Sequence, residues 1–125
     1  MSITITLPLP PRALHPNARK HWRAKMKPKK DQRLEAYWSA RAVISEQVGP
    51  LQVLNWKLAE VQSTWYLARR NDADNLIAWL KATNDGLADA GIVDNDRGFI
   101  FMPPKQVTGK AAKGRREVVL TITKR

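Results

Sequence analysis

Six aspartates lie between positions 72 and 96 of a chain with 22 Lys and Arg residues, 11 Asp and Glu residues and a formal net charge of +11. These acids are Asp72, Asp74, Asp85, Asp89, Asp94 and Asp96. A surface that collects nucleic-acid phosphates should exclude carboxylates, because each carboxylate repels the phosphate backbone. A divalent cation removes this conflict, since bound Mg²⁺ or Mn²⁺ inverts the local charge and can promote phosphodiester hydrolysis. The segment 71–96 is therefore a candidate metal site within a basic protein.

Two aspartate pairs bracket a predicted helix. Asp72 and Asp74 flank one residue, and at the end of an extended strand such a pair faces one side, where one cation can engage both. Asp94 and Asp96 form the second pair, and a strand–helix–strand unit of this length could bring the pairs together. Taken alone, each pair is more typical of helix caps and turns. With both pairs present, we expect Asp72, Asp74 and Asp96 to be the metal ligands, with Asp94 as the second choice for the third.

The amino-acid composition limits which reactions the protein could catalyse and which molecules it could bind. The chain has 125 residues, 43% of them hydrophobic, which predicts one domain with a modest core. It has no cysteine, which excludes disulfides, Cys-ligated zinc, iron–sulfur clusters and thiol catalysis. No membrane-spanning apolar run and no secretory signal stand out, so a cytoplasmic protein without a membrane partner is expected. The basic excess predicts a polyanionic partner, most simply nucleic acid.

Apolar periodicity predicts the elements that position the aspartates. Alternation of apolar and polar residues predicts strands at residues 2–7, 55–68, 98–102 and 117–123. Helical patterns predict a helix capped by Asp31 and running to about residue 48, with Leu34 and Trp38 on its apolar side, and a second from 74 or 75 to Gly91. These elements predict an α+β fold. It is a single small domain, residues 1–125, in which a mixed β-sheet of about four strands packs with two main helices.

Two basic segments lie outside the predicted helices. Residues 12–30 contain eight Lys or Arg, two prolines and no periodic apolar face, which predicts an irregular basic arm. Residues 105–116 predict a Gly/Lys-rich loop that is mobile until it meets a polyanion. We expect Trp22 to contact DNA bases. The predicted DNA-binding residues are Arg19, Lys20, His21, Trp22, Arg23, Arg69, Arg70, Lys110, Lys113 and Arg115.

Segments spread over most of the chain resemble the RusA-type Holliday junction resolvases, metal-dependent endonucleases of prophages and bacteria. The resembling segments are residues 5–11, Pro16-Asn17, His21-Trp22, Asp72-Ala73-Asp74-Asn75-Leu76, Lys81, Asp85-Gly86-Leu87, residues 90–93, Asn95-Asp96, Met102-Pro103 and residues 117–123. The central Asp-x-Asp-Asn element is the most specific part. The resemblance implies that Asp72, Asp74 and Asp96 bind metal and that Lys81 is a helix lysine that assists catalysis.

The chain departs from the family pattern at two positions. The family commonly places its lysine four residues after the second acid, whereas Lys81 follows Asp74 by seven. On a regular helix both spacings share a face, but the longer one lies about 4.5 Å further along the axis. Lys81 could instead pair with Asp85. The second departure is Asn95-Asp96, where the family often has two acids in a row.

The resemblance implies a homodimeric, structure-selective endodeoxyribonuclease that uses Mg²⁺, with Mn²⁺ as a substitute. It would resolve Holliday junctions by paired phosphodiester hydrolysis in DNA recombination and repair, and its partners would be four-way junction DNA and a second copy of itself. Symmetric cuts in two strands need two sites, which a two-fold dimer supplies. Two alternatives stay open. One is a non-catalytic nucleic-acid-binding protein whose aspartates cap helices and pair with arginines, and the other is a related nuclease that prefers flaps or forks.

Overall fold

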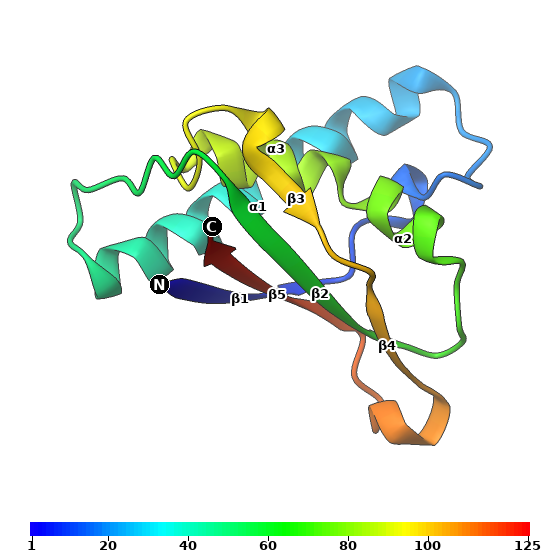
Figure 1. Cartoon of the computed structure of the whole chain (residues 1–125). Coiled ribbons are helices and arrows are strands. Elements are labelled where there is room, and N and C mark those ends of the chain that lie inside the picture. The colour runs from blue at the N-terminus through cyan, green and yellow to red at the C-terminus, as the bar shows by residue number, and fades with distance from the viewer.

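The strand β2 (Ala59–Leu67) is the centre of the fold, because it pairs with three of the four other strands. In this computed structural model, which describes residues 1–125, β2 is antiparallel to β5 (Glu117–Lys124) and parallel to both β3 (Phe99–Phe101) and β4 (Lys105–Thr108). β1 (Ser2–Pro8) adds to the outer side of β5, again antiparallel. The result is a mixed five-stranded sheet (Figure 1). The predicted α+β fold in one small domain is confirmed, with one strand more than expected.

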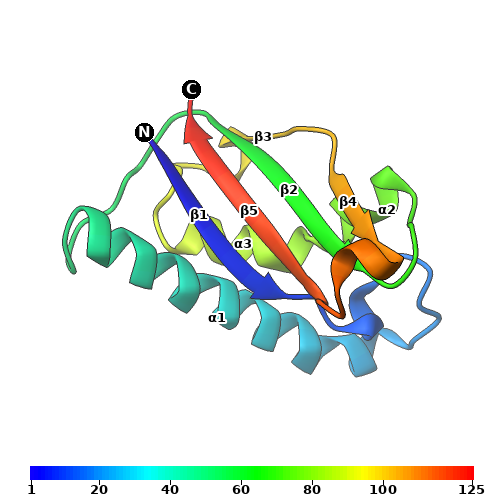
Figure 2. The same cartoon turned by 90° about the horizontal axis from the view of Figure 1, so that it is seen from below.

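Helices cover one face of this sheet. The three α-helices are α1 (Trp22–Gln47), α2 (Ala73–Trp79) and α3 (Lys81–Asp89), and three short 3-10 turns lie at Arg12–Leu14, Asp96–Gly98 and Gly109–Ala112. α1 and α3 lie side by side behind the sheet (Figure 2). Every second residue of β1, of β2 and of β5 as far as Ile122 is buried, as the predicted alternation requires. The core is therefore the layer between the sheet and these two helices.

The predicted irregular arm is helical in its second half, so this prediction is wrong from Trp22 onward. The side chain of His21 accepts a hydrogen bond from the amide of Arg23 (3.2 Å) and caps α1, and Lys, Arg, Ala and Met, which favour helix, dominate its first turns. Pro28 is accommodated inside the helix. Asp31 is not a cap: it lies within α1 and forms an i,i+4 salt bridge with Lys27 (2.7 Å).

The buried face of α1 also differs from the prediction. Gln32, Ala36, Ala40 and Ile44 are buried, whereas Leu34 and Trp38 are exposed, by 46% and 65%. The reason is the close approach of α3: a Cβ on Gly86 would collide with the backbone carbonyl of Arg33. The small side chain of Ala36 therefore lies against α3, whereas Leu34 and Trp38 point away.

The predicted helix from 74 or 75 to Gly91 is present but divided. Leu80, with ψ near 2°, interrupts it between α2 and α3. Gly91 has a positive φ of 84°, as expected of the residue that follows a helix end, and its carbonyl accepts hydrogen bonds from the amides of Leu54 and Asn55. The chain therefore turns back toward the sheet where the sequence predicted.

Residues 105–116, predicted as a Gly/Lys-rich loop, contain a strand and a 3-10 turn. Lys105–Thr108 form β4, which pairs with the C-terminal half of β2, and a 3-10 turn follows at Gly109–Ala112. Ala112 is fully buried and anchors this turn. The strand escaped prediction because its four residues show no apolar alternation, and its backbone pairing with β2 stabilises it instead.

None of the helices combines the length and the apolar character that a transmembrane segment requires.

Candidate functional site

Asp72 and Asp74 lie just beyond the C-terminal end of β2. The chain leaves β2 at Leu67, crosses four residues and reaches Asp72, which has an extended backbone and directly precedes α2. Asp74 lies in the first turn of α2, and one of its carboxylate oxygens accepts a hydrogen bond from the amide of Asn75 (3.1 Å). Both side chains are exposed and neither forms a salt bridge. Two carboxylates without salt-bridge partners, separated by one residue along the chain, are thus exposed to solvent.

Asp94 and Asp96 lie at the other end of the same strand. Because β3 runs parallel to β2, its first residue, Phe99, pairs with Ala59, the first residue of β2. The amide of Asp94 donates to the carbonyl of Trp56 (3.1 Å), which fixes this turn against the chain that enters β2. β2 has nine residues, so its two ends are about 26 Å apart at roughly 3.3 Å per residue.

The two aspartate pairs are therefore not brought together within one chain. No group of three or more Asp, Glu or His side chains is arranged to hold a metal ion. The expectation that a strand–helix–strand unit would join the pairs is wrong for a single chain, and the reason is topological. In a parallel crossover, the helix begins at the carboxyl end of one strand and returns to the amino end of the next.

The later aspartates form a separate cavity, which we call the acidic hollow. It has a volume of about 240 Å³ and is lined by Arg33, Asp85, Ala88, Asp89, Val93, Asp94, Asn95 and Asp96. Arg33 donates two hydrogen bonds to the carboxylate of Asp89, and this pairing lowers the pKa of Asp89 and raises that of Arg33. Asp89, one acid of the segment 71–96, therefore links α3 to α1.

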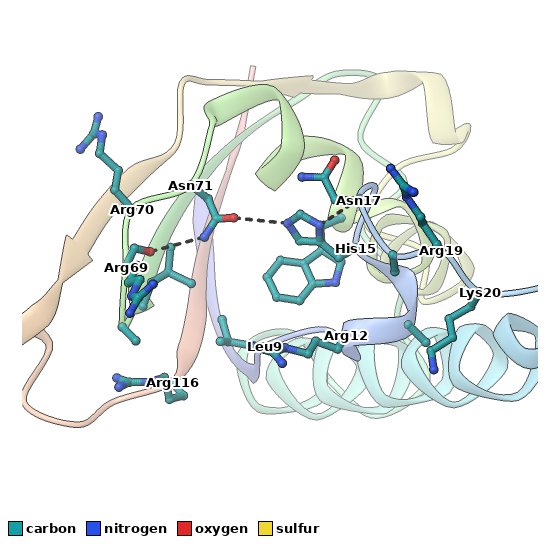
Figure 3. A pocket seen from close by; sticks show the side chains of 15 residues that line it. Leu9, Arg12, His15, Asn17, Arg19, Lys20, Arg69, Arg70, Asn71 and Arg116 are labelled. Carbon is teal, nitrogen blue, oxygen red and sulfur yellow. Dashed lines mark hydrogen bonds between the residues drawn. The ribbon is translucent and has the colours of Figure 1, made fainter.

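A larger cavity lies at the Asp72 end of the sheet, and we call it the basic pocket. Its volume is about 750 Å³, and it opens between the segment 12–20 and the residues that follow β2 (Figure 3). Six of its fifteen lining residues are cationic and none is acidic. The cations are Arg12, Arg19, Lys20, Arg69, Arg70 and Arg116. Asn71, which also lines the pocket, directly precedes Asp72, so the pocket and the two free carboxylates are adjacent.

Asn71 connects the two sides of the basic pocket. Its backbone amide and carbonyl form hydrogen bonds with the side chain of Gln106 in β4 (2.9 and 2.8 Å). The amide of Asn17 donates to Nδ1 of His15, which assigns the ring proton to Nε2, and Nε2 donates to Oδ1 of Asn71 (3.3 Å). The loop that carries Arg69, Arg70 and Asp72 is therefore held from both sides.

Sequence reasoning missed Asn71, Gln106 and His15 as residues that organise this site. Their partners are 35 and 56 positions away along the chain, so no local spacing indicated them. Arg12 and Arg116 were also missed as pocket residues. The sequence signal for both was available, because each lies within a segment already recognised as basic.

The predicted DNA-binding residues divide into three groups. Arg19, Lys20, Arg69 and Arg70 meet in the basic pocket. His21, Trp22 and Arg23 form the exposed start of α1, where the Arg23 guanidinium lies 5.3 Å from the Trp22 ring centre. The third group is Lys110, Lys113 and Arg115, on the turn between β4 and β5, which projects beyond the sheet (Figure 1).

Arg115 has partners within the protein. Its guanidinium stacks on the ring of Tyr66 at 3.5 Å from the ring centre and forms a salt bridge with Glu117 (2.8 Å). The hydrogen bond to Arg115 lowers the pKa of Glu117. Arg115 is therefore less free to meet an external anion than the cations of the basic pocket.

Lys81 is exposed, opens α3 and forms no salt bridge with Asp85 or any other acid. The interruption at Leu80 separates it from the helix that carries Asp74. The axial spacing expected on one regular helix therefore does not apply to this pair.

Comparison with known proteins finds a relative that aligns with most of the chain. No protein-family model matches the chain. An uncharacterized protein of Xylella fastidiosa (strain Temecula1 / ATCC 700964) is 33% identical over 122 residues, which cover 96% of this chain and 75% of the relative. The aligned region spans nearly the whole sheet and its helices.

Proposed function

The chain belongs to one family with the Xylella protein, and we propose that it is a Mg²⁺-dependent endodeoxyribonuclease that cuts branched DNA. The observation that carries this proposal is the adjacency of two free carboxylates, Asp72 and Asp74, to a pocket with six cations and no acid. The resemblance of the same residues to the RusA-type Holliday junction resolvases supports it, and on that basis the four-way junction is the proposed substrate.

The donor set at Asp72 and Asp74 fits Mg²⁺. This ion commonly takes one or two protein carboxylates and completes its coordination with water and substrate phosphate oxygens. Both side chains are exposed, so a hydrated ion can reach them. When bound, the ion would lower the pKa of a coordinated water and polarise the phosphoryl oxygen.

The residues of this chain supply the positioning. Arg69 and Arg70 lie on the same short loop as Asp72, so a phosphodiester held by these arginines lies beside the carboxylates. The hydrogen bonds that join Asn71 to His15 and Gln106 fix that loop before DNA arrives, which reduces the ordering required for reaction. Positive charge at this point would also stabilise the charge that develops on the phosphate in the transition state. Lys81 is proposed to balance charge near the carboxylates.

A second copy of the chain would explain a role for Asp96. Paired cuts in a junction need two sites, and in an antiparallel two-fold dimer the Asp96 end of one chain lies beside the Asp72 end of its partner. Each site would then combine Asp72 and Asp74 of one copy with Asp96, or Asp94, of the other. This arrangement is the proposed homodimer.

The decisive experiment compares DNA substrates under one set of conditions. Purified protein is incubated with a four-way junction, a flap, a fork and a plain duplex, each with Mg²⁺, with Mn²⁺ or with EDTA. The proposal predicts paired symmetric nicks in the junction that require a divalent ion. Cleavage of the flap or fork alone would replace the junction with that substrate.

A second candidate is a nucleic-acid-binding protein without catalysis. It is favoured because no three carboxylates of one chain are arranged to hold a metal ion. It predicts junction binding of equal affinity with and without Mg²⁺, and no incision of any of the four substrates. The same experiment therefore separates the two candidates.

A further inference from the structure

The cations of the basic pocket have almost no partners within the protein. The four salt bridges of the chain involve Lys27, Arg33, Arg115 and Arg125, and none of these lines the pocket. Of the six pocket cations, Arg116 alone donates a side-chain hydrogen bond, to the carbonyl of Arg115 (2.7 Å). Six like charges around one cavity repel each other and destabilise the folded chain. An external anion is the partner that removes this repulsion.

The cations form two groups, which we call banks, on two sides of the cavity. Arg69, Arg70 and Arg116 come from the end of β2 and the start of β5, whereas Arg12, Arg19 and Lys20 come from the segment before α1 (Figure 3). The hydrogen bond from His15 to Asn71 joins these two sides. The separation of the banks is thus set before any ligand binds, which lowers the entropy cost of binding.

The floor between the banks is apolar. Leu9, Leu67 and Trp79 line it. Trp79 is held in place by stacking on Trp65, with ring centres 5.6 Å apart, and by its indole N–H, which donates to the carbonyl of Pro11 (3.0 Å). A ligand that fits this pocket therefore combines negative charge at two edges with an uncharged, partly apolar middle.

A single-stranded nucleic acid has this chemistry. Successive phosphates are separated by a sugar and a base, and a cavity of about 750 Å³ lies within the range of roughly 300–1,000 Å³ that small ligands occupy. A duplex keeps the faces of its bases stacked inside, so no base face can lie on the floor. A groove with cations along its edges and an apolar surface between them is how proteins hold unpaired strands.

We propose that the basic pocket binds an unpaired DNA strand, with phosphates on the two banks and one sugar and base on the floor of Leu9, Leu67 and Trp79. As the substrate subsite of a nuclease, the pocket rests on the proposed function and would hold the strand that leaves a branch point beside Asp72. The binding itself does not require cleavage.

The test measures binding in EDTA, where metal-dependent cleavage cannot occur. A labelled eight-nucleotide thymidylate strand and a duplex of equal strand length are titrated by fluorescence anisotropy at several salt concentrations. Two double variants each remove two charges from one bank: Arg69→Gln with Arg70→Gln, and Arg12→Gln with Arg19→Gln. Lys57→Gln with Lys124→Gln is the matched control, because both lysines are exposed at the opposite end of β2.

We expect the wild-type protein to prefer the single strand. Each pocket double variant should lose at least about tenfold in affinity and about 1.4 in the slope of log K against log salt, since each single-strand phosphate contact contributes about 0.7. The control should change affinity less than about twofold. Equal losses in the control and pocket variants would show that binding follows net charge alone, and this result would overturn the proposal.

An abasic strand with the same number of phosphates tests the floor. We expect it to bind at least about threefold more weakly than the thymidylate strand, because stacked or buried bases add to the affinity of single-strand sites. Equal affinity would overturn the assignment of the floor to a base. Because no metal is present, either failure leaves the cleavage experiment unaffected, and failed cleavage leaves this binding result intact.

Discussion

The basic pocket and the acidic hollow carry opposite charge at opposite ends of β2. They differ in whether that charge is paired within the protein. In the basic pocket, six cations lack salt-bridge partners and no acid is present. In the acidic hollow, Arg33 lies among the aspartates and pairs with Asp89. Charge that is paired inside the protein contributes to the fold, whereas a concentration of unpaired like charge indicates an external partner. The contrast therefore supports the proposed binding at the pocket end and indicates a structural role for Asp89 in the hollow.

The comparison also divides the aspartate segment into two functional parts. Asp72 and Asp74 belong to the pocket end, and the four later aspartates line the hollow. A role for Asp96 in metal binding then depends on a second copy. Substitutions at the two ends should therefore have different effects.

The largest expected effect is on cleavage at the pocket end. Asp72→Asn should lower Mg²⁺-dependent junction cleavage by at least about 10²-fold, because it removes a carboxylate proposed to bind the ion. Junction binding should be retained or tightened, since a repulsive charge next to the phosphates is lost. Asp85→Asn, which removes an equal charge from the acidic hollow, is the matched control for single-turnover nicking rates. Full activity of Asp72→Asn would contradict the proposed site.

The second prediction tests whether the two ends meet in a dimer. Asp72→Asn and Asp96→Asn should each be inactive as homodimers. After the two are mixed under exchange conditions, roughly a quarter of the wild-type nicking rate should return, because half of the dimers then contain one intact composite site out of two. A mixture that stays inactive despite demonstrated subunit exchange would restrict each site to one chain.

A smaller effect is expected from breaking the hydrogen bond between His15 and Asn71, which joins the two sides of the basic pocket. Asn71→Ala removes the bond from His15 and should lower the free energy of unfolding by about 1 kcal/mol, measured in urea. Affinity for the single strand should also fall several-fold, because the two cation banks are no longer held at a fixed separation. Asn95→Ala removes the cap of the 3-10 turn at the acidic hollow and should leave single-strand affinity unchanged. If both variants alter affinity equally, Asn71 has no specific positioning role.

The smallest effect concerns the pair of Arg33 and Asp89 at the hollow end. Asp89→Asn should lower the free energy of unfolding by about 0.5–1 kcal/mol at pH 7, since both side chains are about half exposed and solvent weakens the pair. The pKa of folded Asp89 is lowered, so its contribution is present above the unfolded Asp pKa of about 4 and is lost as pH falls through the folded value. The difference between variant and wild type should thus vanish in acid, as urea unfolding at pH 7 and near pH 2.5 would reveal. A difference that persists at the lower pH would assign it to packing.

Strand prediction succeeded where one face is buried. In Ser2–Pro8 and Glu117–Lys124, the alternation of apolar residues matches the buried positions of the sheet. The helix at 22–47 was only partly predicted, because Pro28 and many lysines hid its first turns and because only Ile44 on its buried face is a large apolar residue, beside Gln32, Ala36 and Ala40. Packing against Gly86 of α3 selects these small residues, and no pattern within the helix itself reveals that neighbour.

The sequence by itself determined the charge contrast, the lack of thiol chemistry, the Asp-x-Asp-Asn element and the alternating strands, because each depends on residue types or on neighbours within a few positions. Only the tertiary structure decided which charges share a surface. The parallel pairing of β2 with β3 places Asp72 and Asp96 at opposite ends of one strand. The bond between His15 and Asn71 joins segments 56 residues apart around one pocket. Strand direction and long-range contacts of this kind are set by the packing of the whole chain, so local spacing cannot specify them.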